Sequence, residues 1–403
     1  KLSNDSLLNN NLLHFYDLNA KATFVLNKHN RLYLSGYSGK DVFAFRELVD
    51  MRWANMTNTV RWNSLISEKL TANYLYTYTN YDYELKTTMG LSNYIWSSGI
   101  NDHSIKADFS YYRNNNSTLR FGGQATRHNY KPGTISSLDN ELIIEMADKN
   151  SLEYALFGSA EIKITEKFHL QAGLRFSAIQ NIGEAKVFVF DDSYEVTDTL
   201  QYGKGDIYNT YAGLEPRLSA AWIISERLSV KSSISRTRQY VQPASNSSSG
   251  MPHDVWFPVS PNLKPQVSDQ VSTGVFRNMF NNIIEISAEI YYKEMDNQID
   301  FRDNANMFFN DLLEGEIRTG IAKAYGAEFL ARKNNGSLTG WIGYTYSKAR
   351  RKIENINNDN WYDANYDKPH NLTIVLNYEL NSRLNLGATW VYTTGGPVTL
   401  PTS

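Results

Sequence analysis

Apolar and polar residues alternate with a period of two along almost the whole chain, and this pattern limits the fold more than any other feature. In residues 168–177, Leu174 and Phe176 fall on one face of an extended strand, and Arg175 and Ser177 fall on the other. Such alternation predicts half-buried β-strands, whereas an amphipathic helix would follow a 3.6-residue period. The alternation recurs at 105–112, 119–126, 214–224, 284–293, 338–346, 371–379 and 384–392. Because the helical period hardly occurs, the chain is predicted to be all-β.

The connections between the predicted strands carry a second pattern, since short and long segments alternate. Polar turns of the hairpin type lie at 28–30, 67–68, 114–116, 166–167, 226–227, 281–282, 334–336 and 381–382. Longer polar stretches separate them at 87–100, 131–149, 182–208, 242–264, 301–318 and 352–366, with a short link near 47–50. In an antiparallel meander, alternate turns lie at the same end of the sheet. One end is therefore predicted to be trimmed and the other to carry large loops.

This asymmetry is typical of a transmembrane antiparallel up-and-down β-barrel in a bacterial outer membrane, with short periplasmic turns and long extracellular loops. About 16 strands are visible in the sequence. Aromatic residues, 13% of the chain, gather towards strand ends, as in the belts at lipid headgroup level. Strands that face lipid must close into a ring, because an open edge in hydrocarbon leaves unpaired N–H and C=O groups. We therefore expect a multi-pass outer-membrane protein whose outer face contacts lipid.

Composition excludes several other classes of protein. The chain has no cysteine, which rules out a disulfide scaffold and a thiolate metal site. A net charge of −2 gives no sign of a nucleic-acid partner. No run of about 18 apolar residues occurs, so no transmembrane helix is expected. A soluble sandwich or propeller is the alternative, but a sandwich core would not bury strand charges such as Glu289, and no blade-length repeat occurs.

Several short motifs follow one another in a fixed order. They are Tyr-Ala-Gly-Leu-Glu-Pro-Arg-Leu-Ser at 211–219, Asn-Leu-Lys-Pro-Gln-Val-Ser-Asp-Gln at 262–270, Tyr-Tyr-Lys-Glu-Met-Asp-Asn-Gln-Ile-Asp at 291–300, Ala-Tyr-Gly-Ala-Glu-Phe at 324–329 and Tyr-Asp-Lys-Pro-His-Asn-Leu at 366–372. Together they resemble the barrel of TonB-dependent outer-membrane receptors, in the branch whose N-terminus carries a carboxypeptidase-regulatory-like module and a plug. The resemblance is most specific over residues 150–395 and looser over 1–130.

The resemblance implies more structure than this chain contains. Such transporters form 22-stranded barrels with a plugged lumen. Here the chain opens inside the barrel, shows no plug domain or TonB-box-like segment, and stops before the aromatic C-terminal strand of the family. Residues 1–403 are therefore expected to be one partial barrel domain, truncated at both ends. The resemblance also implies a plug from the same full-length chain, a TonB-type energising protein and, as a further option, a surface lipoprotein as partners.

No catalytic or metal-binding motif is present. The chain lacks G-x-S-x-G, H-E-x-x-H and P-loop patterns, and its seven histidines are scattered singly. We therefore expect no enzymatic activity, no metal and no cofactor. A catalytic pair of the barrel-lipase or barrel-protease kind remains the alternative. The charged residues on the polar strand faces are instead expected to face the lumen and to pair with one another and with the plug: Glu215, Arg217, Glu285, Glu289, Glu328 and Arg332.

Recognition is expected in the long loops, where surface binding residues commonly lie. Loop 242–264 offers His253, Asp254, Trp256 and Phe257 to a ligand or a partner lipoprotein, because desolvated aromatic side chains are efficient anchors. The resemblance favours the alternative that these residues pack the loop against its neighbours. Loop 182–208 is acidic and aromatic and could contact a sugar, a peptide or a ferric chelate through Phe188, Phe190, Asp191, Asp192 and Tyr194.

Three functions compete on this evidence. By resemblance, the leading hypothesis is active import of an external nutrient, either a chelate, a glycan or a peptide. The second is a passive porin-like channel, which would conduct ions steadily in a planar bilayer. The third is a barrel that no longer transports and serves as a partner in a surface assembly. Nothing in the residues identifies the ligand.

Overall fold

The computed structural model describes residues 11–45, 49–87, 94–137, 143–244, 255–306 and 310–398. The described residues form one large sheet of 18 strands, of which only β7 (Ile143–Glu145) and β20 (Tyr362–Asp363) are very short. The long strands are β1 (Leu12–Asn27), β2 (Asn30–Phe45), β3 (Val49–Ser67), β4 (Leu70–Thr87), β5 (Tyr94–Asn114), β6 (Ser117–Ser137), β8 (Lys149–Thr165), β9 (Phe168–Ile182), β12 (Ile207–Ser225), β13 (Leu228–Gln239), β16 (Gln266–Met279), β17 (Ile284–Phe301), β18 (Ile317–Lys333), β19 (Leu338–Ile353), β21 (His370–Asn381) and β22 (Leu384–Thr393).

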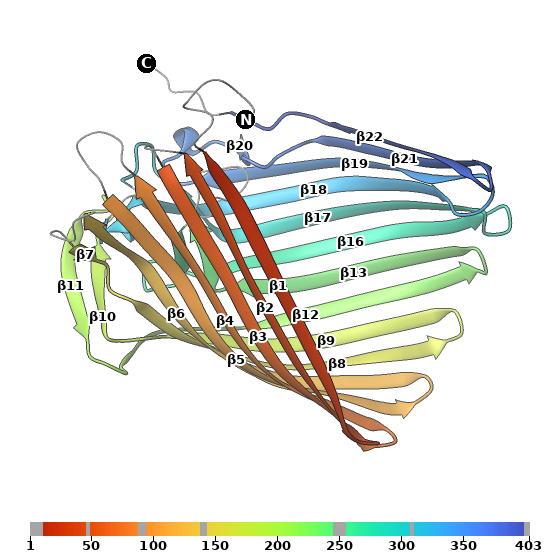
Figure 1. Ribbon diagram of the computed structural model, residues 1–403, viewed down its shortest axis with the longest axis horizontal. Coiled ribbons are helices and arrows are strands. Elements are labelled where there is room, and N and C mark those ends of the chain that lie inside the picture. The colour runs from red at the N-terminus through yellow and green to blue at the C-terminus, as the bar shows by residue number, and fades with distance from the viewer. Residues whose placement is uncertain are drawn as a thin grey trace.

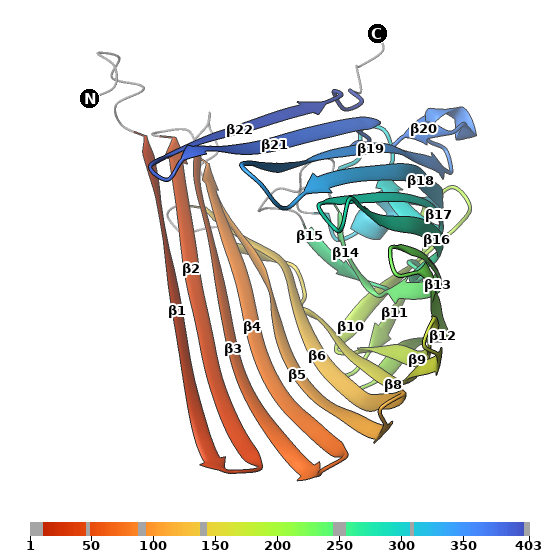
Figure 2. The same cartoon turned by 90° about the vertical axis from the view of Figure 1, so that its right-hand side faces the viewer.

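The sheet is an antiparallel meander, as the sequence predicts. Each long strand pairs with the next one along the chain, from β1–β2 to β21–β22. Figures 1 and 2 show the sheet curling into an open, barrel-like wall. Among the described strands, no pairing joins β1 to β22, so these strands do not close the ring by themselves.

The connections alternate in length as predicted. At one end, successive strands are joined by tight turns, such as Asn27–Asn30 and Ser67–Leu70. At the other end the long connections carry small elements of their own: β10 (Ala185–Phe190) and β11 (Val196–Tyr202), β14 (Val241–Ala244) and β15 (Val255–Pro258), and the short 3-10 helices η1 (Leu313–Glu316) and η2 (Asn357–Asp359). No helix among the described residues is long and apolar enough to cross a membrane.

The strands at the long-loop end extend further than the sequence predicts. Residues 94–100 and 131–137, predicted to lie in loops, belong to β5 and β6, which are 21 residues long each. A tilted barrel strand needs only about 9–11 residues to cross a bilayer. The excess residues can be polar because they lie beyond the lipid, and for that reason their hydrophobic pattern does not reveal them as strand.

The two faces of the wall differ in chemistry. Outward-facing residues form an apolar belt with large exposed side chains, including Leu174, Leu214, Ile290 and Phe329. Such exposure is expected of a surface that faces lipid. A row of charges follows this belt at its long-loop end, where the register aligns Arg236, Asp269, Glu294 and Lys323 on neighbouring strands. The concave face carries the alternate, polar residues of the same strands.

Candidate functional site

A network of charged side chains crosses the concave face of the wall. Glu215 of β12 is only 4% exposed. Its carboxylate lies 3.6 Å from Arg175 on the neighbouring strand and 3.6 Å from Arg217, and it accepts a 2.6 Å hydrogen bond from Ser177. The Ser177 hydroxyl also lies 2.7 Å from the hydroxyl of Tyr240. The buried carboxylate is therefore surrounded by cations and donors, as a buried charge requires.

The same network continues onto the strands before β9. Arg175 lies 3.9 Å from Glu153, and Glu153 lies 3.6 Å from the imidazole of His128. His128 in turn contacts Asp102 at 2.8 Å. Oppositely charged groups thus alternate across β5, β6, β8, β9 and β12. The sequence favours a polar lumen, turn or loop position for His128 over a metal site but names no partner for it, because a single histidine in a strand gives no sequence signal of its cross-strand neighbours.

The other charges predicted for the lumen lie on the same face as this network but are arranged differently. The strand register places Glu289 directly opposite Glu328, and Glu285 directly opposite Arg332. Within the described part of the chain, none of these four side chains makes an ion pair shorter than 4.0 Å. Of the predicted inward charges, Glu215 and Arg217 pair with each other. Pairing of Glu285, Glu289, Glu328 and Arg332 with a plug stays a prediction.

A second cluster ties the long loops together at their base. Glu314 of η1, with 14% of its side chain exposed, accepts hydrogen bonds from Lys149 at 2.8 Å, Ser260 at 2.9 Å and Asn262 at 2.8 Å. Asn262 also donates to the carbonyl oxygen of Phe188 at 3.0 Å. The Glu314 carboxylate thus connects the β17–β18 connection to the start of β8 and to the β13–β16 connection, and Asn262 extends these contacts to the β9–β12 connection. We call Glu314 with Lys149, Ser260 and Asn262 the loop hub.

The charges of the loop hub fix its ionisation. Burial alone would raise the pKa of the Glu314 carboxyl, but the Lys149 ammonium and the hydrogen bonds from Lys149, Asn262 and Ser260 outweigh it and hold that pKa below its ordinary value. Beneath the hub, Leu263, Phe301 and Leu313 pack together with Ile317 in an apolar cluster. The loops are therefore joined by both a charge cluster and a small core.

The hairpin β10–β11 carries the residues that the sequence proposed for recognition in loop 182–208. Phe190 is packed so closely on η1 that a Cβ added at Gly315 would lie 2.7 Å from its ring. Tyr194 lies under the guanidinium of Arg318, 3.4 Å from its ring centre, and its hydroxyl donates to Glu354. Asp191 accepts hydrogen bonds from the backbone of its own turn. Phe190 and Tyr194 thus hold the hairpin against neighbouring connections, and Asp191 stabilises its own turn.

Two further residues of that hairpin have other surroundings. The carbonyl of Phe188 joins the loop hub, and its ring lies 4.6 Å from the Lys186 ammonium. Asp192 is exposed. Asp191 is exposed as well, whereas Phe188, Phe190 and Tyr194 are half-buried.

The hairpin β14–β15 turns inward over the concave face (Figure 2). Strand β15 contacts β5 and β6, and β14 contacts β17, so the hairpin bridges two parts of the wall. Trp256 lies in β15, paired with Pro243, and is half-buried, and Phe257 is paired with Gln242. The predicted residues His253 and Asp254 lie outside the described residues.

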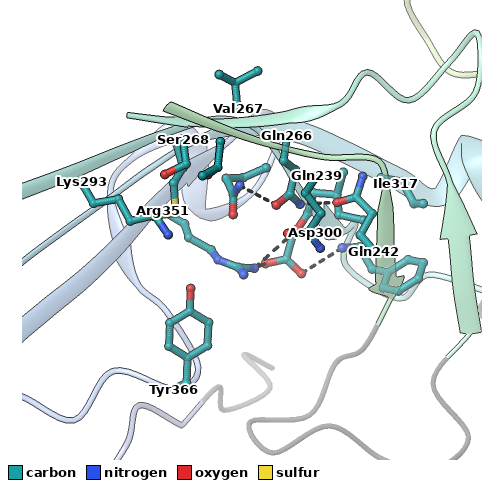
Figure 3. A pocket seen from close by; sticks show the side chains of 15 residues that line it. Gln239, Gln242, Gln266, Val267, Ser268, Lys293, Asp300, Ile317, Arg351 and Tyr366 are labelled. Carbon is teal, nitrogen blue, oxygen red and sulfur yellow. Dashed lines mark hydrogen bonds and ion pairs between the residues drawn. The ribbon is translucent and has the colours of Figure 1, made fainter. Parts of the chain in front are cut away.

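A cavity of about 330 Å³ opens between β14, β16, β17 and β19 on the concave side. Figure 3 shows Lys293 and Arg351 extending into this space, with Gln239, Gln242 and Gln266 at the side opposite Lys293. Gln298 donates to Gln266 at 2.9 Å, and Gln266 donates to Gln242, so the three amides form a chain. We call this cavity the glutamine pocket.

The cations of the glutamine pocket differ in their partners. Arg351 lies 3.5 Å from Asp300 and 5.6 Å from the centre of the Tyr366 ring. The register places the small Ala322 between β17 and Arg351, which leaves room for the guanidinium to cross to Asp300. Lys293 has no carboxylate within 4.0 Å among the described residues.

A β-bulge at Asn297 builds part of this pocket. The β17–β18 register shifts between Asp296 and Gln298, and Asn297 adopts a left-handed backbone with φ of 54°. The Asn297 amide donates to the carbonyl of Pro265 at 2.7 Å, which holds the bulge in place. Because a bulge inserts one residue, it reverses the alternation beyond it and turns Gln298 and Asp300 inward.

Neither the loop hub nor the glutamine pocket was predicted from sequence. Glu314 and the glutamines resemble any polar loop or strand residue when the chain is read locally. The one available signal was the Asn-Gln-Ile-Asp stretch of residues 297–300, where the alternation fails. A break in period two with an asparagine favours a bulge, but it does not reveal which side chains meet there.

The curled meander, its apolar outer belt, its polar concave face and its one-sided loops define an outer-membrane β-barrel protein. The family model for the TonB-dependent receptor-like β-barrel matches residues 2–401, and the chain belongs to that family. It is therefore a bacterial outer-membrane protein of a family of receptors and transporters. A search of curated proteins found no match to this chain.

Solved structures of this family share the fold of the chain at low sequence identity. The alcaligin outer-membrane receptor FauA of Bordetella pertussis is 13% identical with a TM-score of 0.63, covering 94% of this chain and 60% of its own. The ferric-catecholate import receptor Fiu of E. coli is 15% identical with a TM-score of 0.63, covering 94% and 64%. A mutant of the Serratia marcescens hemophore receptor HasR, in complex with its hemophore HasA and heme, is 13% identical with a TM-score of 0.66, covering 95% and 64%. The chain thus spans less than two thirds of each.

Proposed function

We propose that the full-length protein containing this chain imports a soluble external ligand across the outer membrane, using a plug and a TonB-type energising protein. The observation that carries the proposal is the loop hub. Glu314 connects Lys149, Ser260 and Asn262 over a polar concave wall. Loops held in one arrangement present a pre-organised mouth, which lowers the entropic cost of binding a ligand.

We also propose that these residues form part of one longer barrel domain. The support is that β1 and β22 do not pair with each other among the described strands, although strand edges inside a bilayer must be satisfied. Additional strands of the same chain would pair with both. The unpaired inward carboxylates Glu289 and Glu328 would then face the plug. A surface lipoprotein, if one binds, would meet the long-loop side, where Asp192 is exposed.

Energised import is tested with cells that express the full-length protein. Uptake of labelled ferric chelates, oligosaccharides and short peptides is measured with and without the TonB-type protein of the same cells. We expect at least one compound to enter only when both proteins are present. Uptake that persists without the TonB-type protein would contradict the proposal.

A passive channel is separated by conductance. The purified full-length protein is inserted into a planar bilayer, where a plugged receptor should carry no steady ionic current. A stable open conductance would favour the porin-like alternative. A barrel that only supports a surface assembly would show neither current nor uptake of any compound tested.

A further inference from the structure

We propose that the glutamine pocket binds an acidic oligosaccharide. In this complex Lys293 would pair with a carboxylate of the ligand, and the glutamine amides would hydrogen-bond to its sugar hydroxyls. This inference rests on the proposed import function and deepens it by naming a ligand class. The glutamine pocket has a volume of about 330 Å³, which lies at the small end of the range for small-molecule pockets. It suits a short oligosaccharide end better than a large chelate.

The amide chain is suited to hydroxyl groups. Each glutamine side chain offers both donors and an acceptor, and a sugar hydroxyl is also both donor and acceptor. Because Gln298 donates to Gln266 and Gln266 donates to Gln242, the chain has a direction and ends on the Gln242 amide nitrogen. Hydrogen bonds in such a series strengthen one another.

The end of that chain lacks an acceptor. Gln242 is 1% exposed, and its Nε2 atom has no hydrogen-bond partner among the described residues. A buried donor without an acceptor destabilises the protein, so this position favours an incoming oxygen atom. Gln239 uses its own amide on the carbonyl of Val241 at 2.8 Å, which leaves its oxygen for the cavity.

The charge of the pocket favours an acidic ligand. The lining holds two cations, Lys293 and Arg351, and one carboxylate, Asp300. Asp300 lies 3.5 Å from Arg351 and also accepts a 2.8 Å hydrogen bond from Tyr362. Lys293 is half-buried and has no counter-charge within 4.0 Å in the described part of the chain. A ligand carboxylate would supply that charge.

The backbone around the pocket disfavours a peptide. Extended peptides commonly bind by adding a strand to a free sheet edge. Here β16 pairs with β13 on one side and, from Val267 onward, with β17 on the other. In the described sheet no main-chain edge of β16 is therefore free beside Val267 or Ser268, and recognition there must come from side chains.

The test uses purified full-length protein in detergent and trigalacturonate as the probe, with binding measured by calorimetry. Maltotriose is the neutral sugar of matched length, and Gly-Glu-Gly is the acidic peptide. We expect binding of trigalacturonate only. Lys293→Met should weaken it about tenfold or more, because it removes a charge-assisted hydrogen bond, whereas Lys293→Arg should retain most of the affinity.

Glu289→Gln is the matched control, since Glu289 lies on the same strand and face outside the pocket, and it should leave binding unchanged. The inference is overturned if trigalacturonate does not bind, if Lys293→Met binds it equally well, or if maltotriose or the peptide binds as tightly. Binding without energised uptake would refute the import proposal alone. Energised uptake of another compound, without trigalacturonate binding, would refute this inference alone.

Discussion

The ammonium of Lys149 lies 2.8 Å from the carboxylate of Glu314, although the two residues are 165 positions apart in the sequence. This contact joins the start of β8 to η1, which lies between β17 and β18. Because Lys149 begins β8 directly after the β6–β8 connection and Glu314 lies in the β17–β18 connection, their contact limits how far these two connections can move independently. The loop hub therefore holds long connections together at their base.

Replacing Lys149 should open the mouth without unfolding the barrel. Lys149→Met leaves the Glu314 carboxylate with its hydrogen bonds from Ser260 and Asn262 but removes its counter-ion and the hydrogen bond that Lys149 donates, at a local cost of about 1–3 kcal/mol. Hydrogen exchange should speed up in residues 255–265 and 310–317 and stay unchanged in β8 and β9. Asp192→Asn, at an exposed position of the neighbouring loop, is the control. Equal exchange in both variants would show that the hub does not hold the loops.

Acid should release the same loops. The pKa of the Glu314 carboxyl in the folded hub lies below the ordinary value of 4.5, so its stabilising effect is complete above that value. The effect is lost as the pH falls through the depressed pKa. Loop protection should be flat from neutral pH down to about 4.5 and decline only below it. In Glu314→Gln the decline should disappear, and a loss of protection near neutral pH would disagree with this assignment.

The concave charge network should tolerate some substitutions and not others. Glu215→Gln removes the carboxylate between Arg175 and Arg217 and should destabilise the barrel by about 1–3 kcal/mol, seen as unfolding at lower urea concentration on heat-modifiability gels. Glu289→Gln should change little or even stabilise, because Glu289 faces Glu328 rather than a cation. The opposite order of effects would mean that a plug or another segment reverses the local charge.

The outer belt should show a dependence on depth. Ile290 is 57% exposed on the outer face of β17, so Ile290→Arg should cost about 2–4 kcal/mol for folding into lipid vesicles. Glu294 lies four residues closer to the loops, in the charged row, and Glu294→Arg should cost about 0–1 kcal/mol. Similar costs at both positions would place the edge of the hydrocarbon elsewhere.

Gly340 should resist substitution for a backbone reason. Its φ is 149°, and a Cβ added there would lie 2.1 Å from the carbonyl oxygen of Val375. Gly340→Ala should therefore lower the yield of folded barrel, with a cost of about 1–3 kcal/mol from strain alone. Gly158→Ala is the control, because nothing lies within 4 Å of the added atom. Normal folding of the Gly340 variant would show that β19 and β21 can separate locally.

The sequence determined the all-β meander, the two faces of its sheet and the end of the sheet that carries the long connections. These properties are local: alternation along a strand assigns each residue to the lipid side or the concave side, and a turn's length depends on its own few residues. Leu174 and Arg175 could thus be placed on opposite faces without knowledge of any neighbour. The predicted inward position of Glu215 follows from the same rule.

The tertiary structure decided which of those inward residues meet. The Asn297 bulge shifts the register by one residue and turns Gln298 and Asp300 towards the pocket, against the alternation that precedes them. Lys149 contacts Glu314 only once the strands between them have paired and the sheet has curled. A period of two carries information about a residue's face and none about its distant partners. The barrel's wall could therefore be predicted from the sequence, whereas the loop hub and the glutamine pocket form only when the chain folds.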